Sequence, residues 1–440
     1  MDNQRYSLII IMNSPWYGTT IPAPNVPYSL HSPSTFPEKM HPFAVTTLSI
    51  LSLLLLLLIS LSVDTPAVVA DIDDDDESHK KNHLGSSTSS AKQKVACPWC
   101  PQYHPLRTFV LVGQSNMVGH GAVSQLDGGG NQLNATLEWL VSNVPEQFGF
   151  LKNKSTKNHQ QGGWTVRPDV LMACNRRGDL LPIMSTYGNL HASLCGGDPG
   201  QYQIGPELGF GWTVGNVLNT NKHTDKILLI KVAWGGKSLA EDFRPPSSGG
   251  KVGEYYWSMI HTVRAVLANV TGYFPSEKHR PVKLSGFAWH QGWNDGCDVN
   301  MTAEYEYNLA NLIRDVRIDL GVPNLPVSIG TSGMTGEYDT SRRADIVRAQ
   351  LAVANKDKYP EFEGTVASVD TRPYSRDPSP ASPSNFGFHW NNNCESYWLV
   401  GKGMGLAMAE LVLRQEGRLK DGKTVHNMDD VDRTQSTKTK

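Results

Sequence analysis

Five short, almost entirely apolar runs recur along the chain and constrain its fold more than any other feature. They cover residues 108–112, 226–233, 283–289, 326–329 and 365–369. Runs of this kind are typical of strands buried on both faces, as in parallel sheets. Segments with helical periodicity accompany them, around residues 259–267, 309–320 and 395–414. This alternation predicts an α/β fold, a three-layer α/β/α sandwich with a parallel sheet.

Composition changes at both ends of the 440-residue chain. Residues 71–95 and 417–440 are polar and charged, which predicts a disordered linker and a disordered tail. We therefore expect one folded domain at residues 96–416. Within it, residues 119–205 are rich in Gly and Asn, and we interpret them as long loops over one edge of the sheet, with a Cys174–Cys195 disulfide as a candidate tie. The formal net charge of -2 gives no electrostatic reason to expect a nucleic-acid partner.

The N-terminal region, residues 1–70, reads as a leader with an export signal. Residues 43–63 are uncharged and apolar, and small residues at Val68 and Ala70 predict signal-peptidase cleavage after Ala70. Met40 would begin a signal peptide of ordinary proportions, so we infer that it is the true start or that the residues before it are a translated leader. The alternative is an uncleaved membrane anchor through residues 43–63. Either reading predicts a secreted or extracytoplasmic protein.

Cysteines and glycosylation motifs agree with export. All six cysteines follow the predicted cleavage site. The C-x-x-C pair formed by Cys97 and Cys100 follows a predicted linker and not a strand, so a structural disulfide is favoured over a redox motif. Four N-glycosylation sequons begin at Asn134, Asn153, Asn269 and Asn300.

A serine follows the first predicted strand directly. The segment from Gly113 to Met117 reads GQSNM and places Ser115 on the turn between a strand and a helix. A nucleophilic serine needs such a turn, where its oxygen is exposed and backbone N–H groups face the substrate oxyanion. The alternative is a Ser-Asn helix cap. Because ligands of open α/β sheets bind at the carboxyl ends of strands, the other motifs should also follow strands.

Two of them do. The second predicted strand ends in Gly235 and Gly236, which allow a backbone N–H to approach a ligand closely, although an ordinary turn would look the same. The third strand ends in the sequence HQGWND, in which Gln291 or Asn294 could donate to an oxyanion and His290 or Asp295 could order the site.

A histidine precedes the last predicted helix. His389 lies in the sequence GFHWNNN and is a candidate general base for a distant serine. A lone histidine is more often structural, so this assignment depends on the other three motifs.

Together the four motifs resemble the SGNH-type carbohydrate esterases, specifically the sialate O-acetylesterase and plant acetylesterase-like family, over residues 107–412. GQSNM matches that family's first block fully, the second block supplies an oxyanion-hole glycine, the third commonly reads H/Y-Q-G-E-S/N-D, and the last carries the catalytic histidine. The resemblance implies a flavodoxin-like sandwich and an acyl-enzyme mechanism with Ser115 as nucleophile and His389 as base. It requires no metal and no organic cofactor.

The resemblance also implies a substrate, an acetylated oligo- or polysaccharide or glycan. Oxyanion donors are expected at Ser115, Gly236 and Gln291, with Asn294 as a further candidate. Substrate contacts are expected at the residues that flank the catalytic blocks: Gln114, Asn116, Gly235, His290, Trp293 and Trp390.

Two departures from the family pattern concern catalysis. The family usually carries Asp three residues before the histidine, where this chain has Phe386. The orienting acid is then Asp370 or Asp295, or the site works as a dyad. Trp293 also replaces the usual acidic residue of the third block. The alternatives are therefore a catalytically weak carbohydrate-binding protein on the same fold and an esterase for small non-sugar esters.

Overall fold

The computed structural model describes residues 104–153, 163–175, 180, 183–198, 200–219, 225–420 and 423–425. The predicted signal or anchor, the predicted linker, Cys97, Cys100 and most of the predicted tail lie outside these residues. The four sequon asparagines are all described, and all four are exposed. Domain boundaries, export and glycosylation stay predictions. Within the described residues, no helix combines the length and the apolar character needed to cross a membrane.

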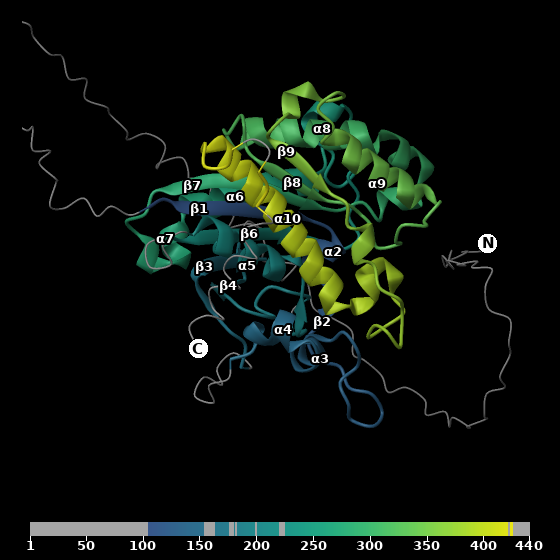
Figure 1. Ribbon diagram of the computed structural model, residues 1–440. Coiled ribbons are helices and arrows are strands. Elements are labelled where there is room, and N and C mark those ends of the chain that lie inside the picture. Colours follow the sequence, from purple (N-terminus) through teal and green to yellow (C-terminus); the bar gives the residue numbers. More distant parts are fainter. Residues whose placement is uncertain are drawn as a thin grey trace, which may run out of the picture. The chain divides into compact units, whose positions relative to one another are not determined.

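A seven-stranded sheet forms the centre of the domain, in the order β4-β3-β6-β1-β7-β8-β9 (Figure 1). Its strands are β1 (Leu106–Gly113), β3 (Arg167–Cys174), β4 (Thr186–Leu190), β6 (Ile227–Ala233), β7 (Val282–His290), β8 (Val327–Gly330) and β9 (Val366–Val369). All neighbouring pairs are parallel except β3 and β4. A separate antiparallel pair joins β2 (Gly121–Ala122) to β5 (Gln203–Ile204). The five predicted strands and the mostly parallel sheet are confirmed.

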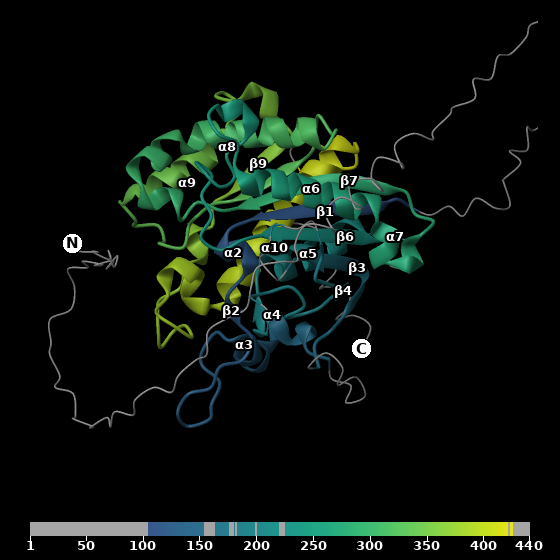
Figure 2. The same ribbon diagram turned by 180° about the vertical axis from the view of Figure 1, so that it is seen from behind.

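Helices cover both faces of the sheet (Figures 1 and 2). The longer ones are α5 (Pro206–Leu218), α6 (Glu254–Ala268), α8 (Val299–Asp319), α9 (Arg342–Val353) and α10 (Cys394–Gln415). The short ones are α2 (Ser115–Val118), α3 (Leu137–Asn143), α4 (Pro145–Phe148) and α7 (Val270–Tyr273). The 3-10 turns are η1 (Gly149–Leu151), η3 (Pro246–Ser248), η4 (Pro275–Glu277), η5 (Asp295–Cys297), η6 (Pro360–Phe362), η7 (Arg372–Tyr374) and η8 (Gly387–Asn392).

Alternating side chains of β1 explain the three layers. Phe109 and Leu111 belong to the apolar core shared with α5 and α10, whereas Val110 and Val112 belong to the core shared with α6, α8 and α9. All four side chains are fully buried. A strand that buries both faces needs apolar residues at every position, which is why the sequence shows an unbroken run there.

One sequence interpretation was wrong: residues 119–205 are not only loops, because they contain β3 and β4 at one edge of the sheet. Polar residues conceal the start of β3. Arg167 and Asp169 form a buried ion pair with a 2.7 Å contact, so charged side chains stand where the pattern leads one to expect apolar ones. The predicted disulfide between Cys174 and Cys195 is present and joins the end of β3 to the loop after β4.

Candidate active site

Ser115 stands where the central strand of the sheet ends. β1 pairs with β6 on one side and β7 on the other, and Ser115 is the first residue of α2 immediately beyond it. The N-cap position belongs to Gln114, whose side chain makes no capping bond. Ser115 is therefore not the capping residue of this helix. Its side chain lies at the inner end of a cavity and is nearly buried, with a relative exposure of 9%.

The four sequence motifs meet around this cavity, whose volume is about 360 Å³. It is lined by Gln114, Ser115, Val118, His120, Asp198, Gly235, Gly236, Trp293, Asn294, Phe388 and His389. Most of these residues follow the carboxyl ends of β1, β6 and β7 or precede α10, and Asp198 comes from the loop after β4. The cavity thus lies at the strand edge where the parallel topology collects polar loops.

The loop that carries His389 has an unusual backbone. Trp390, Asn391 and Asn392 all have positive φ, between 51° and 59°. Non-glycine residues rarely adopt this left-handed region, and a bulky residue there needs support from its surroundings. Trp390 is fully buried, and the Asn392 amide donates to the backbone oxygen of His120 at 2.7 Å.

Asn116 fixes the same loop to the serine turn. Its side-chain Nδ2 donates to the backbone oxygen of Phe388 at 2.9 Å, and its Oδ1 accepts from the Tyr397 hydroxyl at 2.8 Å. The same hydroxyl contacts the His389 oxygen at 3.3 Å. One buried amide thereby couples the position of Ser115 to that of His389. Asn116 itself is 1% exposed and does not line the cavity, so the structure gives no support to the predicted substrate contact.

The ring of His389 packs against two other rings. It stacks on His120 with 3.9 Å between ring centroids and 19° between planes, and it meets Phe388 edge-on at 4.5 Å. Burial, and then the charge of His120, lower the pKa of His389 to about 3. The ring is therefore neutral near pH 7, as a general base must be.

Neither predicted orienting acid reaches His389. The Asp370 carboxylate is held by Arg372, whose guanidinium donates to both oxygens, and this pair lowers the pKa of Asp370. Asp295 is fully buried and accepts from the backbone N–H groups of Leu239 and Ala240. Neither carboxylate lines the cavity. Phe386, in the place of the family's acid, is 55% exposed.

The predicted oxyanion donors divide into two groups. Gly236 lines the cavity in a left-handed conformation with φ of 69°, and a Cβ on Gly235 would lie 4.0 Å from that of Ser115, so both glycine backbones stand close to the serine. The Gln291 amide points elsewhere and donates to Gln114, Asp295 and the oxygen of Lys237. Asn294 lines the cavity while donating to the Gly236 oxygen at 2.5 Å.

The predicted substrate contacts divide in the same way. Gln114, Gly235 and Trp293 line the cavity, whereas His290 and Trp390 are buried behind it. His290 bonds to the Gly330 oxygen at 3.0 Å, and burial lowers its pKa to about 4. These two buried rings stack on each other at 6.2 Å and support the site from within.

Sequence reasoning missed two charged or titratable residues of the cavity, His120 and Asp198. His120 could have been found, because it lies five residues after the nucleophile candidate on the same turn. Asp198 belongs to the loop after β4, in the region interpreted as irregular, and no sequence signal marks it.

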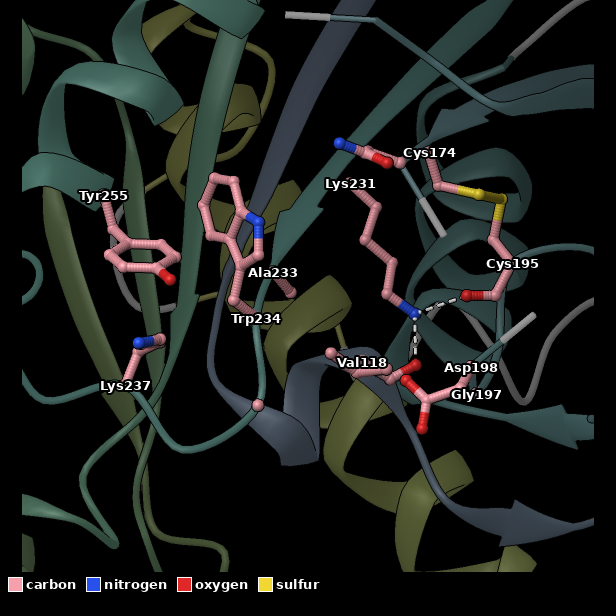
Figure 3. A pocket seen from close by; sticks show the side chains of 12 residues that line it. Val118, Cys174, Cys195, Gly197, Asp198, Lys231, Ala233, Trp234, Lys237 and Tyr255 are labelled. Carbon is pink, nitrogen blue, oxygen red and sulfur yellow. Dashed lines mark hydrogen bonds between the residues drawn. A yellow bond between two sulfur atoms is a disulfide. The ribbon is translucent and has the colours of Figure 1, made fainter. Parts of the chain in front are cut away.

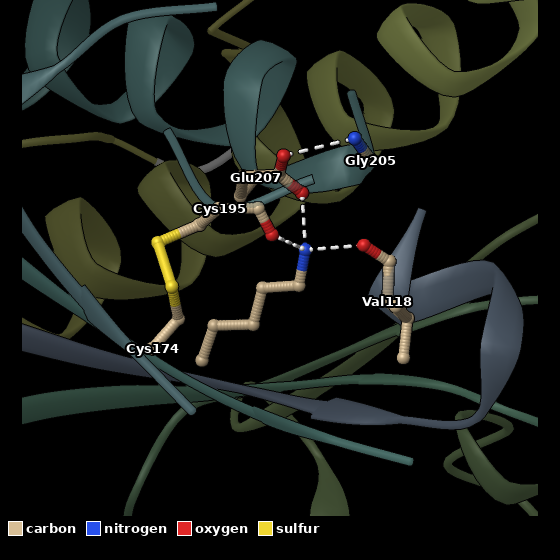
Figure 4. The surroundings of a disulfide bond; sticks show 6 residues. Val118, Cys174, Cys195, Gly205 and Glu207 are labelled. Atoms are coloured by element: carbon tan, nitrogen blue, oxygen red, sulfur yellow. Dashed lines mark hydrogen bonds and ion pairs between the residues drawn. A yellow bond between two sulfur atoms is a disulfide. The ribbon is translucent and has the colours of Figure 1, made fainter. Parts of the chain in front are cut away.

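A smaller cavity of about 140 Å³ adjoins the first and shares Val118, Asp198 and Gly235 with it (Figure 3). Lys237 lies on its wall, 4.2 Å above the ring of Tyr255. The buried Lys231 also lines this smaller cavity (Figure 3). Its Nζ donates to Glu207 at 2.8 Å and to the backbone oxygens of Val118 at 2.7 Å and Cys195 at 2.8 Å, and Figure 4 shows these bonds beside the disulfide. This lysine thereby links the serine turn to the disulfide loop.

Comparison with known proteins identifies the family of the chain. Residues 105–370 match the family model described as "Carbohydrate esterase, sialic acid-specific acetylesterase". "Probable carbohydrate esterase At4g34215" from Arabidopsis thaliana is 24% identical over 254 residues, which cover 55% of this chain and 75% of that protein.

Solved structures with a similar fold include three relatives of low sequence identity. The Arabidopsis thaliana protein AT4G34215 has a TM-score of 0.44 at 17% identity, covering 69% of this chain and 98% of that one. The carbohydrate acetylesterase XAC1771 from Xanthomonas citri has a TM-score of 0.41 at 13% identity, covering 70% of this chain and 57% of that one. NanS has a TM-score of 0.41 at 14% identity, covering 72% of this chain and 99% of that one. The family model spans more than half of the chain, and the chain therefore belongs to the carbohydrate esterase family of sialic acid-specific acetylesterases, which are hydrolases of ester bonds.

Proposed function

We propose that this protein removes O-acetyl groups from a carbohydrate through an acyl-enzyme formed on Ser115. One observation carries the proposal: Ser115 and His389, which come from opposite ends of the domain sequence, line one cavity at the carboxyl edge of the sheet. A serine at a strand end, a neutral imidazole and flexible glycine backbones make up the parts needed for acyl transfer.

The reaction divides into two halves. Ser115 Oγ attacks the acetyl carbonyl carbon while His389 takes the hydroxyl proton, and the backbone N–H groups near Gly236 and Ser115 stabilise the oxyanion. The bond to the sugar oxygen then breaks, and His389 returns the proton to that oxygen. A water molecule attacks the acetyl-serine in the same way, which releases acetate and restores the Ser115 hydroxyl. In such enzymes, one preorganised oxyanion donor lowers the activation barrier by about 3 kcal/mol.

An aromatic rim at the cavity suits a sugar substrate. Trp293 and Phe388 line the cavity with their rings 6.0 Å apart, and the exposed ring of Phe386 lies 5.7 Å from Phe388. Arg343 stacks on Trp293 at 3.9 Å and holds its ring. Aromatic faces bind apolar surfaces while leaving polar edges wet, which matches the faces of sugar rings. We therefore assign the acetylated sugar, and not only its acetyl group, to this rim.

The site of action that we propose is outside the cytoplasm. The Cys174–Cys195 disulfide is buried beside the cavity and supports this location, because such bonds persist in oxidising compartments. Exposed sequon asparagines are consistent with the same route.

Hydrolysis assays on single variants test the mechanism. We expect Ser115→Ala and His389→Ala to lower kcat on p-nitrophenyl acetate and acetylated xylan by about 10³-fold or more, with thermal unfolding unchanged. Ser142→Ala and His261→Ala are matched controls, because both residues are exposed on helices outside the cavity. Full activity in either cavity variant would overturn the mechanism.

The second candidate is a carbohydrate-binding protein that has lost most of its activity. Two features favour it: Phe386 stands in the position of the usual acid, and no carboxylate among the described residues contributes to the pKa shift of His389. Negligible hydrolysis by the unmodified protein on a broad panel of acetylated sugars, together with measurable binding of those sugars, would select this candidate.

A further inference from the structure

His389 lacks the acid that its family supplies, yet the cavity contains a second imidazole. The His120 and His389 rings are nearly parallel at 3.9 Å, a distance at which one ring restricts the tilt and rotation of the other. Both side chains line the cavity beside Ser115. The question is what orients His389 when it takes the serine proton.

The two histidines are held together from their backbones as well. The Asn392 side chain donates to the His120 oxygen at 2.7 Å, and Asn116 donates to the Phe388 oxygen at 2.9 Å, one residue before His389. Gly119, just before His120, has φ of 90°, and a Cβ there would lie 2.2 Å from the Gly205 Cα. Only glycine fits at position 119. The close contact with Gly205 therefore fixes the direction of the backbone between the serine turn and His120.

Charged groups near the two histidines shift the pKa of His120 in opposite directions. Burial lowers the pKa of His120 most strongly; the negative charge of Asp198 raises that pKa, the positive charge of Lys231 lowers it, and the nearby Gln203 side chain raises it. Lys231 is paired with Glu207 at 2.8 Å. Tyr397, the remaining titratable group at these backbones, is buried with a pKa well above its usual value and stays neutral. Asp198 is therefore a carboxylate of the cavity wall that acts on His120.

We propose that His120 is a positioning residue for the general base, fixing the His389 ring by stacking, and that the negative charge of Asp198 acts on His120. The proposal rests on the esterase function above. It assigns to a stacked imidazole the task of orientation, which an acid before the histidine performs elsewhere.

The stack also sets a condition on the pH. When His389 takes the serine proton it becomes positive, so His120 must be neutral at that moment, since two positive rings 3.9 Å apart repel each other. Protonation of His120 in acid therefore blocks the reaction. Because Asp198 raises the pKa of His120, removing its charge lowers that pKa and extends the active form to lower pH.

Three variants of the full chain separate these roles. In His120→Ala the stack is lost, and we expect kcat on p-nitrophenyl acetate to fall about 10- to 100-fold with KM within about twofold. His120→Phe keeps a flat ring and should recover most of that kcat. In Asp198→Asn the acid limb of the kcat profile should move to lower pH, and it should not move when the same change is made in His120→Phe.

His261→Ala is the matched control, because His261 also stacks on a ring, that of Trp257, but lies on α6 outside the cavity. Thermal unfolding of each variant separates lost activity from lost folding. Unchanged kcat in His120→Ala, or an equal pH shift from Asp198→Asn with and without His120, would overturn the proposal while leaving Ser115-dependent hydrolysis intact. Failure of the esterase function itself would instead appear as equal hydrolysis in the unmodified protein and Ser115→Ala.

Discussion

Asp295 shows how a residue can control a site that its side chain does not reach. It is fully buried, and its carboxylate accepts from the N–H groups of Leu239 and Ala240 and from the Gln291 amide at 2.6 Å. These bonds join the loop after β6, which begins at the cavity glycines, to the loop after β7. Burial raises the pKa of Asp295 more than these hydrogen bonds lower it, so that the pKa is about 6.

This shift predicts how stability depends on pH. The pKa is higher in the folded protein than in the unfolded chain, so the contribution of Asp295 to folding is fully present below about pH 4 and is lost as the pH rises through about 6. The loss amounts to about 3 kcal/mol. Relative to Asp295→Asn, which does not titrate, the free energy of unfolding of the unmodified protein should fall across this window in denaturant titrations. A rise with pH would contradict the assignment.

The sequence predicts the position of the loops better than the direction of the individual side chains that they carry. Strand ends meet at one edge of a parallel sheet, so the sequence could indicate that the loops of Ser115, Gly236 and His389 come together. It could not indicate that the Gln291 amide turns away from the cavity, because its partners Gln114 and Lys237 come from other loops. Side-chain direction depends on contacts that form only in the folded chain.

At the scale of elements, the short helix α2 and the turn η8 act as one unit through the Asn116 side chain. Asn116→Ala removes the bond to the Phe388 oxygen and one of the two acceptors of the Tyr397 hydroxyl, which keeps its 3.3 Å contact with the His389 oxygen. We expect kcat to fall about 100-fold, because a displacement of about 1 Å between nucleophile and base has that effect. The free energy of unfolding should fall by about 1–3 kcal/mol.

Tyr397→Phe is the control for that variant, since it removes one bond to Asn116 and keeps the ring and the bond from Asn116 to the Phe388 oxygen. Its kcat should stay within about tenfold of the unmodified value. Equal kcat losses in both variants would show that the hydroxyl, and not the Asn116 amide, couples the two elements. Steady-state kinetics on p-nitrophenyl acetate and chemical unfolding provide both readouts.

Most elements could be predicted, and the exceptions share a cause. Largely apolar runs marked β1, β6, β7, β8 and β9. β4 escaped notice because its sequence, TYGNL, is mostly polar and only its last residue is buried. β3 escaped because its first residues form a buried ion pair.

For the whole molecule, the Cys174–Cys195 disulfide joins the end of β3 to the loop after β4 on the wall of the smaller cavity. It closes a segment with a sequence separation of 21 and restrains the unfolded chain, which corresponds to about 3 kcal/mol of stability. The double variant Cys174→Ala/Cys195→Ala should therefore unfold at lower denaturant concentration. Reductant should destabilise the unmodified protein more than the double variant; an equal effect on both would contradict this role.

The central position of β1 has a consequence for motion. Its backbone amides are paired on both sides, so they should be among the last to exchange with deuterated solvent, whereas β4 at the sheet edge should open earlier. Ser115 extends from the slowly exchanging strand, and Asp198 extends from the edge. We therefore expect the side of the cavity that carries Asp198 to open more readily than the strand end that carries Ser115.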